Sequence, residues 1–102
     1  MCGGLPESAV AKLRATFSDY PEIDRVVLYG SRALGSYRTG SDIDLTIEAE
    51  AMDLSKLLTI GNRIDDLLLP WKVDLSLRHK IDNPDLLAHI DRVGVTFYPV
   101  QS

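Results

Sequence analysis

Three aspartates occur at spacings that could bring their carboxylates together. Asp42 and Asp44 lie two residues apart at the start of an alternating apolar run, so on a strand both side chains leave the same face. A strand rises about 3.3 Å per residue, which places the two roughly 7 Å apart. Asp74 lies in a second alternating run, between Val73 and Leu75. It can join the other two if the two strands are neighbours.

Carboxylate oxygens in this arrangement suit a hard divalent ion such as Mg²⁺ or Mn²⁺, which would relieve their mutual repulsion. Three converging carboxylates are the protein half of a two-metal site for phosphoryl transfer. Each part alone is weaker evidence, because aspartate pairs are common on the solvent faces of strands and Asp74 alone could be such a residue. A calcium loop is excluded, since the residues after Asp44 are apolar and no glutamate falls at the required spacing.

Gly30 and Ser31 directly follow a short apolar run that ends at Tyr29. A strand that ends in glycine and turns into a short helical segment exposes backbone N–H groups. Together with the Ser31 hydroxyl, these groups can bind phosphate oxygens. The patterns G-x-x-x-x-G-K-[ST] and G-x-G-x-x-G are both absent. For the dipeptide alone, a plain turn capped by serine is the simpler interpretation.

The elements that must position these residues alternate along the chain. Period-two patterns predict strands over 43–48 and 71–77, a short β-branched apolar run predicts one over 24–29, and a last short strand is expected over 95–98. Helical periodicity predicts helices over 7–19, 54–68 and 84–93. Asp53 and Asn83 are the expected N-caps of the last two helices. The order α-β-(loop)-β-α-β-α-β predicts a small α/β (α+β) domain, with a mixed sheet of about four strands covered by helices. We expect one domain over residues 1–102.

Helical stripes indicate which side chains of these helices are buried. The first helix is expected to bury Val10, Leu13 and Phe17, and His89 is expected on the exposed side of the last helix. The two histidines, His79 and His89, are too far apart and too unlike in context to indicate a zinc site. The apolar face expected for the helix over 54–68 consists of Leu54, Leu57, Leu58, Gly61, Ile64, Leu67 and Leu68.

Composition limits the classes of protein that the chain can belong to. A net charge of −4 argues against a broad grip on nucleic-acid phosphates, so we expect no direct nucleic-acid binding. No apolar run is long enough to span a bilayer, and MCGGLPES lacks the basic region and apolar core of a secretory signal. A single cysteine, Cys2, excludes an intrachain disulfide and fits a reducing compartment. The expected location is the cytoplasm.

The combination of these parts is more specific than any one of them. Gly30-Ser31, ten intervening residues, Asp42-Ile43-Asp44 and the later Asp74 resemble the nucleotidyltransferase fold shared with DNA polymerase beta. The segments GSRALG, SDIDL and LPWKVDLS are similar to those of the minimal nucleotidyltransferases of prokaryotes, whose MntA-type members act as antitoxins. The element order of the resemblance covers essentially the whole chain.

The resemblance implies a role for each site residue. Gly30 and Ser31 would hold the triphosphate of ATP. Asp74 would bind the second of two Mg²⁺ (or Mn²⁺) ions and help to deprotonate an acceptor hydroxyl. The implied catalytic and metal-binding residues are Asp42, Asp44 and Asp74, and the implied nucleotide-binding residues are Gly30, Ser31 and Arg32.

The resemblance also implies a partner. MntA-type proteins transfer AMP from ATP to a tyrosine of a HEPN-domain ribonuclease toxin, so the implied assembly is a hetero-oligomer, with a homo-oligomer as the alternative. Two other functions stay open: a non-catalytic antitoxin that blocks its partner by contact, and an adenylyltransferase for a small molecule such as an aminoglycoside. The apolar segments 67–71 and 95–98 are candidates for a partner surface or for core.

Overall fold

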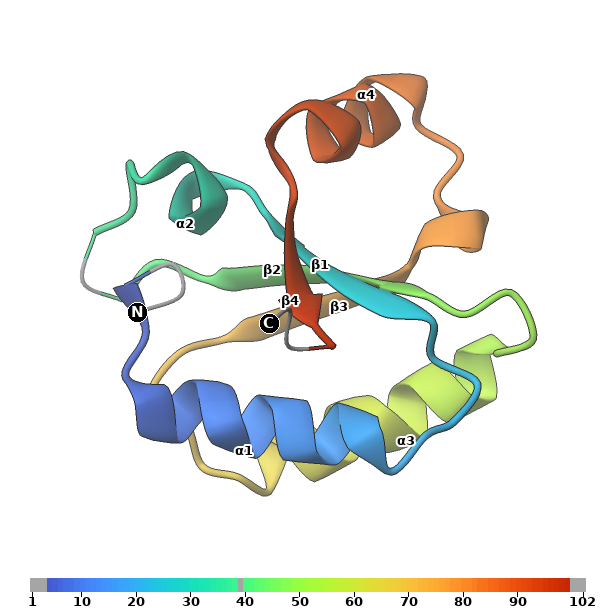
Figure 1. Cartoon of the computed structure of the whole chain (residues 1–102), viewed down its shortest axis with the longest axis horizontal. Coiled ribbons are helices and arrows are strands. Elements are labelled where there is room, and N and C mark those ends of the chain that lie inside the picture. Colours follow the sequence, from blue (N-terminus) through green and yellow to red (C-terminus); the bar gives the residue numbers. More distant parts are fainter. Residues whose placement is uncertain (1–3, 39, 100–102) are drawn as a thin grey trace.

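A computed structural model describes residues 4–38 and 40–99, so Cys2 lies outside the described residues. The predicted fold class is confirmed: a mixed four-stranded sheet is covered by helices (Figure 1). In chain order the elements are α1 (Glu7–Ser18), β1 (Arg25–Tyr29), α2 (Ser31–Leu34), β2 (Ile43–Glu48), α3 (Leu54–Asp65), β3 (Val73–Leu77), the 3₁₀ helix η2 (Arg78–Lys80), α4 (Pro84–Val93) and β4 (Val95–Tyr98).

The sheet has the order β3-β2-β1-β4. β1 pairs antiparallel with both β2 and β4, whereas β2 and β3 are parallel. A parallel pair needs a crossover connection, and α3 supplies it. The strands that carry Asp44 and Asp74 are therefore neighbours, which is the condition for Asp74 to join the other two aspartates.

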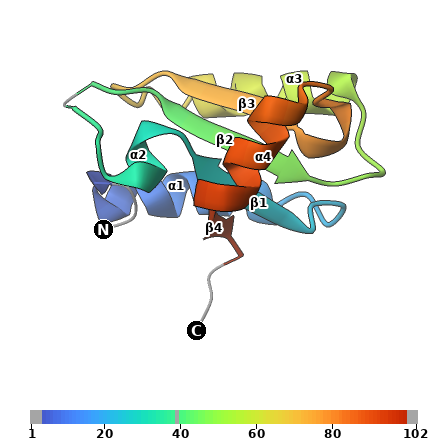
Figure 2. The same cartoon turned by 90° about the horizontal axis from the view of Figure 1, so that it is seen from above.

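Helices cover both faces of the sheet, but unequally. α1 and α3 lie on one face, and α2 and α4 lie on the other (Figures 1 and 2). The main core fills the space between the sheet and the α1–α3 layer, and Val10, Leu13 and Phe17 are buried there as predicted. Residues of β2 alternate between this core and the opposite, polar face, which carries Asp44, Thr46 and Glu48. We call this second surface the polar face.

Two helix starts follow the predicted chemistry. The Asp53 side chain accepts a hydrogen bond of 2.9 Å from the Lys56 backbone N–H, and Asn83 Oδ1 accepts from the N–H groups of Asp85 and Leu86. These side chains satisfy N–H groups that have no partner within the helix. No helix in the described part of the chain is long and apolar enough to cross a bilayer.

The region around α3 corrects the prediction in three respects. α3 ends at Asp65 rather than at 68, and β3 begins at Val73 rather than at 71. The buried residues of α3 are Ile60 and Ile64, with Leu57 packed beside them, whereas Leu54 and Leu58 are 56% and 69% exposed. A run rich in leucine offers two overlapping stripes, and packing against α1 and β3 selects the one through Ile60.

The segment after α3 also separates into exposed and packed residues. Leu68 is exposed, whereas Leu67, Leu69 and Trp71 pack against the core. Near the C-terminal end of the described chain, Phe97 of β4 is fully buried. Most apolar residues of the segments 67–71 and 95–98 therefore serve the core.

Candidate active site

Asp44 lies at the centre of a row that crosses three strands. In the sheet register it pairs with Tyr29 of β1 on one side and with Asp74 of β3 on the other. Residues directly opposite one another on neighbouring strands share a face, so all three side chains leave the polar face. Asp42 precedes β2 by one residue, and its charge acts on Asp44. The structure thus brings the three predicted carboxylates to one end of the polar face, which we call the carboxylate end.

The carboxylate end is electrostatically strained. Burial raises the pKa of the Asp44 carboxyl above its ordinary value, the charges of Asp74 and Asp42 raise it further, and His89 acts in the opposite direction. The neighbouring negative charges thus disfavour the ionised form of Asp44. A cation bound among them would reverse this effect, which makes the set of oxygen donors suitable for a divalent ion.

The described carboxylates do not form a complete metal cage. Across residues 4–38 and 40–99, no group of three or more His, Cys, Asp or Glu side chains is arranged to hold an ion by itself. Mg²⁺ does not require such a cage, because it usually takes one or two carboxylates and completes its shell with water and substrate phosphates. The donor set therefore fits Mg²⁺ or Mn²⁺ when a nucleotide supplies the other ligands.

Gly30 joins the predicted phosphate-binding turn to the carboxylates. Its backbone has φ 76° and ψ −155°, a region that is essentially restricted to glycine. A Cβ atom at this position would clash with Oδ2 of Asp44. The backbone can therefore pass against the carboxylate only because residue 30 has no side chain. Ser31, which is half-buried, begins α2 directly after this contact.

Arg32 holds the loop that leads to the carboxylates. Its side chain is buried, and its Nε and one terminal nitrogen donate to the Ser41 carbonyl at 3.1 and 2.9 Å. The guanidinium also lies against the rings of Tyr37 and Trp71, at 5.1 and 5.7 Å. Because Ser41 immediately precedes Asp42, these contacts position the start of β2. A contact between Arg32 and nucleotide stays a prediction.

Tyr29 lies beside Asp44 on the polar face of the sheet. It is buried, and burial is the main reason that its pKa is raised; a side-chain hydrogen bond with Ser76 lowers the pKa, and the charges of Asp44 and Asp74 raise it. Because β2 lies between β1 and β3, a Tyr29 ring that reaches Ser76 must cross β2. Ser76 in turn donates a hydrogen bond of 2.9 Å to Thr46 Oγ1. Thr46 and Ser76 thus tie β2 to β3 behind the carboxylates.

α4 packs on β1 and brings His89 to the carboxylate end. Ile90 clusters with Val27 and Tyr29, and the His89 ring meets the Tyr29 ring edge to face at 6.3 Å and 81°. The expectation that His89 is exposed is wrong: it is half-buried, because the face of α4 that covers β1 includes it at its margin. From the sequence, Tyr29 or Tyr37 was a candidate for contact with a ligand, and His89 was set aside. The signal for Tyr29 is its place at the end of the strand, directly before Gly30-Ser31.

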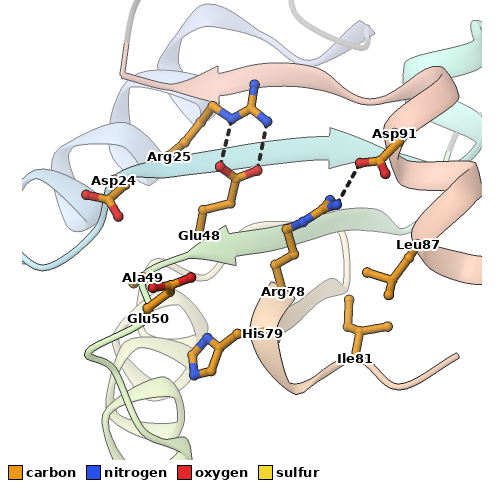
Figure 3. Close-up of a pocket in the computed structure, with 10 residues that line it drawn as sticks. All are labelled: Asp24, Arg25, Glu48, Ala49, Glu50, Arg78, His79, Ile81, Leu87 and Asp91. Carbon is orange, nitrogen blue, oxygen red and sulfur yellow. Dashed lines mark hydrogen bonds and ion pairs between the residues drawn. The ribbon is translucent and has the colours of Figure 1, made fainter. Parts of the chain in front are cut away.

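The opposite end of the polar face holds an open pocket of about 580 Å³ (Figure 3). Arg25 donates to both carboxylate oxygens of Glu48, at 3.1 and 2.7 Å, and Arg78 donates to Asp91 at 2.7 Å. Figure 3 shows these pairs between β1, β2, the η2 segment and α4. We call this region the paired end, because its central charges have partners of opposite sign.

Comparisons with known proteins agree with this arrangement. The protein-family model described as "Polymerase beta, Nucleotidyltransferase" matches residues 11–101. A search of curated proteins finds no match.

Several solved structures share the fold. A crystal structure of a toxin–antitoxin with AMP-PNP is 23% identical, with a TM-score of 0.71 over 95% of this chain and 76% of that chain. A crystal structure of the toxin–antitoxin MntA-HepT is 18% identical, with a TM-score of 0.69 over 93% and 74%. A putative nucleotidyltransferase from Sulfolobus solfataricus is 23% identical, with a TM-score of 0.51 over 93% and 90%. At these identities the likeness is one of fold.

Proposed function

This chain belongs to the polymerase beta nucleotidyltransferase family, and from that premise we propose that it transfers AMP from ATP to a tyrosine hydroxyl of a HEPN-domain toxin and so acts as an antitoxin. The observation that carries the proposal is the row in which Asp44 and Asp74 face one another across parallel strands. Asp42 lies beside this row, and Gly30 lies against Asp44. The arrangement joins a phosphate-binding turn to a set of carboxylates.

The carboxylates are the proposed ligands of the metal. Asp42 and Asp44 would hold both Mg²⁺ (or Mn²⁺) ions, and Asp74 would complete the second position. When bound, these ions neutralise charge on the triphosphate and on the departing pyrophosphate. Gly30 and Ser31 would hold the phosphates, which places the α-phosphorus beside the carboxylate end.

The transfer step is a displacement at the α-phosphorus. The acceptor oxygen forms a bond to this phosphorus while the bond from the phosphorus to the oxygen bridging the α- and β-phosphates breaks. Pyrophosphate leaves with the bonding electron pair, and the product is a phosphodiester between AMP and the tyrosine. Asp74 accepts the proton of the acceptor hydroxyl and passes it to water.

The partner part of the proposal has separate support. Two of the compared structures are toxin–antitoxin complexes, and one of them contains AMP-PNP. In the proposed arrangement the single domain supplies the catalytic half-site and the toxin supplies the tyrosine, in a hetero-oligomer in the cytoplasm and without direct binding of nucleic acid.

The test uses the protein encoded beside this chain, which the proposal expects to be a HEPN-domain toxin. The purified pair, ATP and Mg²⁺ should release pyrophosphate and add AMP-sized mass increments to a toxin tyrosine. Asp42→Ala combined with Asp44→Ala should abolish both signals. Glu48→Gln, which removes a carboxylate from the paired end of the same strand, is the matched control and should retain both.

Three outcomes would change the proposal. AMP transfer by the double variant at the parental rate would disprove the metal assignment. Silencing of the toxin in cells by the double variant, without AMP transfer, would assign antitoxin action to contact alone. Transfer of AMP to an aminoglycoside, with the toxin left unmodified, would identify a small-molecule adenylyltransferase.

A further inference from the structure

We infer that His89 of α4 donates a hydrogen bond to the triphosphate of the bound nucleotide, a role that rests on the proposed function and adds a substrate contact from outside the sheet. The nucleotide would then be contacted from two directions. Residues of the sheet and of the turn after β1 would bind it, and α4 would add a contact through His89.

The position of His89 on α4 is the first step of the argument. Ile90 is 2% exposed and anchors the helix on Val27 and Tyr29. The residues on either side of Ile90 point to opposite ends of the polar face. Asp91 reaches Arg78 at the paired end, whereas His89 meets Tyr29, which stands in register with Asp44. α4 therefore separates the two ends and presents an imidazole to the carboxylate end.

The orientation of the imidazole is the second step. Its edge-to-face contact with Tyr29, at 6.3 Å and 81°, fixes the plane of the ring. Tyr29 is followed directly by Gly30 and Ser31, the proposed phosphate-binding turn. A triphosphate held by this turn beside Asp44 would thus lie near the ring that His89 contacts.

The charge balance of the site is the third step. A triphosphate carries several negative charges, and the three aspartates around it repel them. A hydrogen-bond donor on α4 would offset part of this repulsion. Neutral and protonated imidazole both carry an N–H donor, so the proposed hydrogen bond does not depend on the charge of the ring.

The two histidines of this chain permit a direct test. The imidazole signals of His79 and His89 would be followed by NMR while AMP-PNP and Mg²⁺ are added to the protein. Binding should shift the His89 signal and leave His79, at the paired end, unchanged. A shift of the Ser31 amide without a shift of His89 would overturn the inference and leave the proposed function standing. No shift at any of these residues would overturn both.

Paired substitutions separate binding from packing. His89→Phe keeps an aromatic ring against Tyr29 but removes the donor, and His89→Gln keeps an N–H donor but removes the ring. We expect His89→Phe to weaken AMP-PNP binding about tenfold, and His89→Gln to weaken it about threefold or less. His79→Ala, the control, should bind as the parent does. The reverse order, with Phe near parental affinity and Gln impaired, would mean that His89 acts through packing and would overturn the inference.

Discussion

The two ends of the polar face treat charge in opposite ways. At the paired end, Arg25 and Glu48 form a two-point ion pair, and Arg78 pairs with Asp91. At the carboxylate end, Asp42, Asp44 and Asp74 lie near one another, and Asp44 is partly removed from water. The two ends are only four residues apart along β2, from Asp44 to Glu48, or roughly 13 Å at a rise of 3.3 Å per residue.

The difference shows which end is arranged for folding and which for a ligand. Opposite charges at the paired end satisfy one another and need nothing further. Like charges at the carboxylate end disfavour the metal-free fold, and residues that are unfavourable for stability are typical of functional sites. Neutralising a carboxylate should therefore have opposite consequences at the two ends.

The largest expected effect is on catalysis. Asp42→Asn, Asp44→Asn and Asp74→Asn should each lower the rate of ATP-dependent pyrophosphate release by about 10²–10³-fold, because each removes charge from the site where the triphosphate reacts. Glu48→Gln should change the rate less than about twofold. A comparable loss in Glu48→Gln would mean that both ends belong to the active site and would end the distinction between them.

The second prediction compares two glycines with positive φ. Gly30→Ala should cost about 2–3 kcal/mol of stability and most of the activity, because the new Cβ meets Asp44 and the backbone region excludes alanine. Gly35 also has a positive φ, 81°, but a Cβ atom added there would have no other atom within 4 Å. The matched variant is Gly35→Ala. It should cost about 1–2 kcal/mol and leave turnover intact. Equal losses of activity in the two variants would argue against the Gly30–Asp44 contact as a catalytic constraint.

The third prediction concerns added metal. Mg²⁺ at ten times its dissociation constant should stabilise the parent protein by about 1.4 kcal/mol, because it binds the folded state. The measurement is the melting temperature with and without the ion. Asp44→Asn should lose most of this gain, and Glu48→Gln should keep it. An equal gain in all three proteins would place the ion elsewhere.

The smallest effect is on the stability of the metal-free protein. The raised pKa of Asp44 means that the folded state holds the proton more tightly than the unfolded chain. The ionised carboxylate therefore destabilises the fold at neutral pH, and this penalty disappears as the pH falls through the raised pKa toward the ordinary value near 4. Asp44→Asn should gain about 0.5–1 kcal/mol at pH 7, a modest figure because the group is partly solvated, and less at pH 4.

The matched substitution at the paired end should have the opposite sign. Glu48→Gln should lose up to about 1 kcal/mol at pH 7, since it removes the partner of Arg25. Denaturant titrations of both variants at pH 4 and pH 7 measure the two signs. Destabilisation by Asp44→Asn at neutral pH would show that the carboxylate end is not strained.

The strands and helix starts that depend on local sequence patterns could be predicted from the sequence alone. Alternation placed Asp44 and Asp74 on strands, and capping chemistry located the starts of α3 and α4 at Asp53 and Asn83. The proximity of the two carboxylates remained conditional, because no local pattern states which strands are neighbours. The register that pairs Asp44 with Asp74 is a property of the assembled sheet.

The errors came from contacts between elements. Which leucine stripe of α3 is buried depends on where α1 and β3 lie, so the run containing Leu54 and Leu58 was assigned to the wrong face. His89 was expected to face solvent because the apolar stripe expected for this helix, through Leu86, Leu87, Ile90 and Val93, leaves it out. Only the packing of α4 on Tyr29 brings it to the carboxylate end.

The parallel pairing of β2 and β3 has a consequence for engineering. The chain between Asp44 and Asp74 leaves β2 at the paired end and returns along the far face of the sheet through α3 (Figure 1). Its first turn, at Glu50 and Ala51, is exposed and lies beyond the end of β2 that is remote from Asp44. A fluorophore attachment site or a short affinity tag inserted there would report on the protein without altering the strand register on which its chemistry depends.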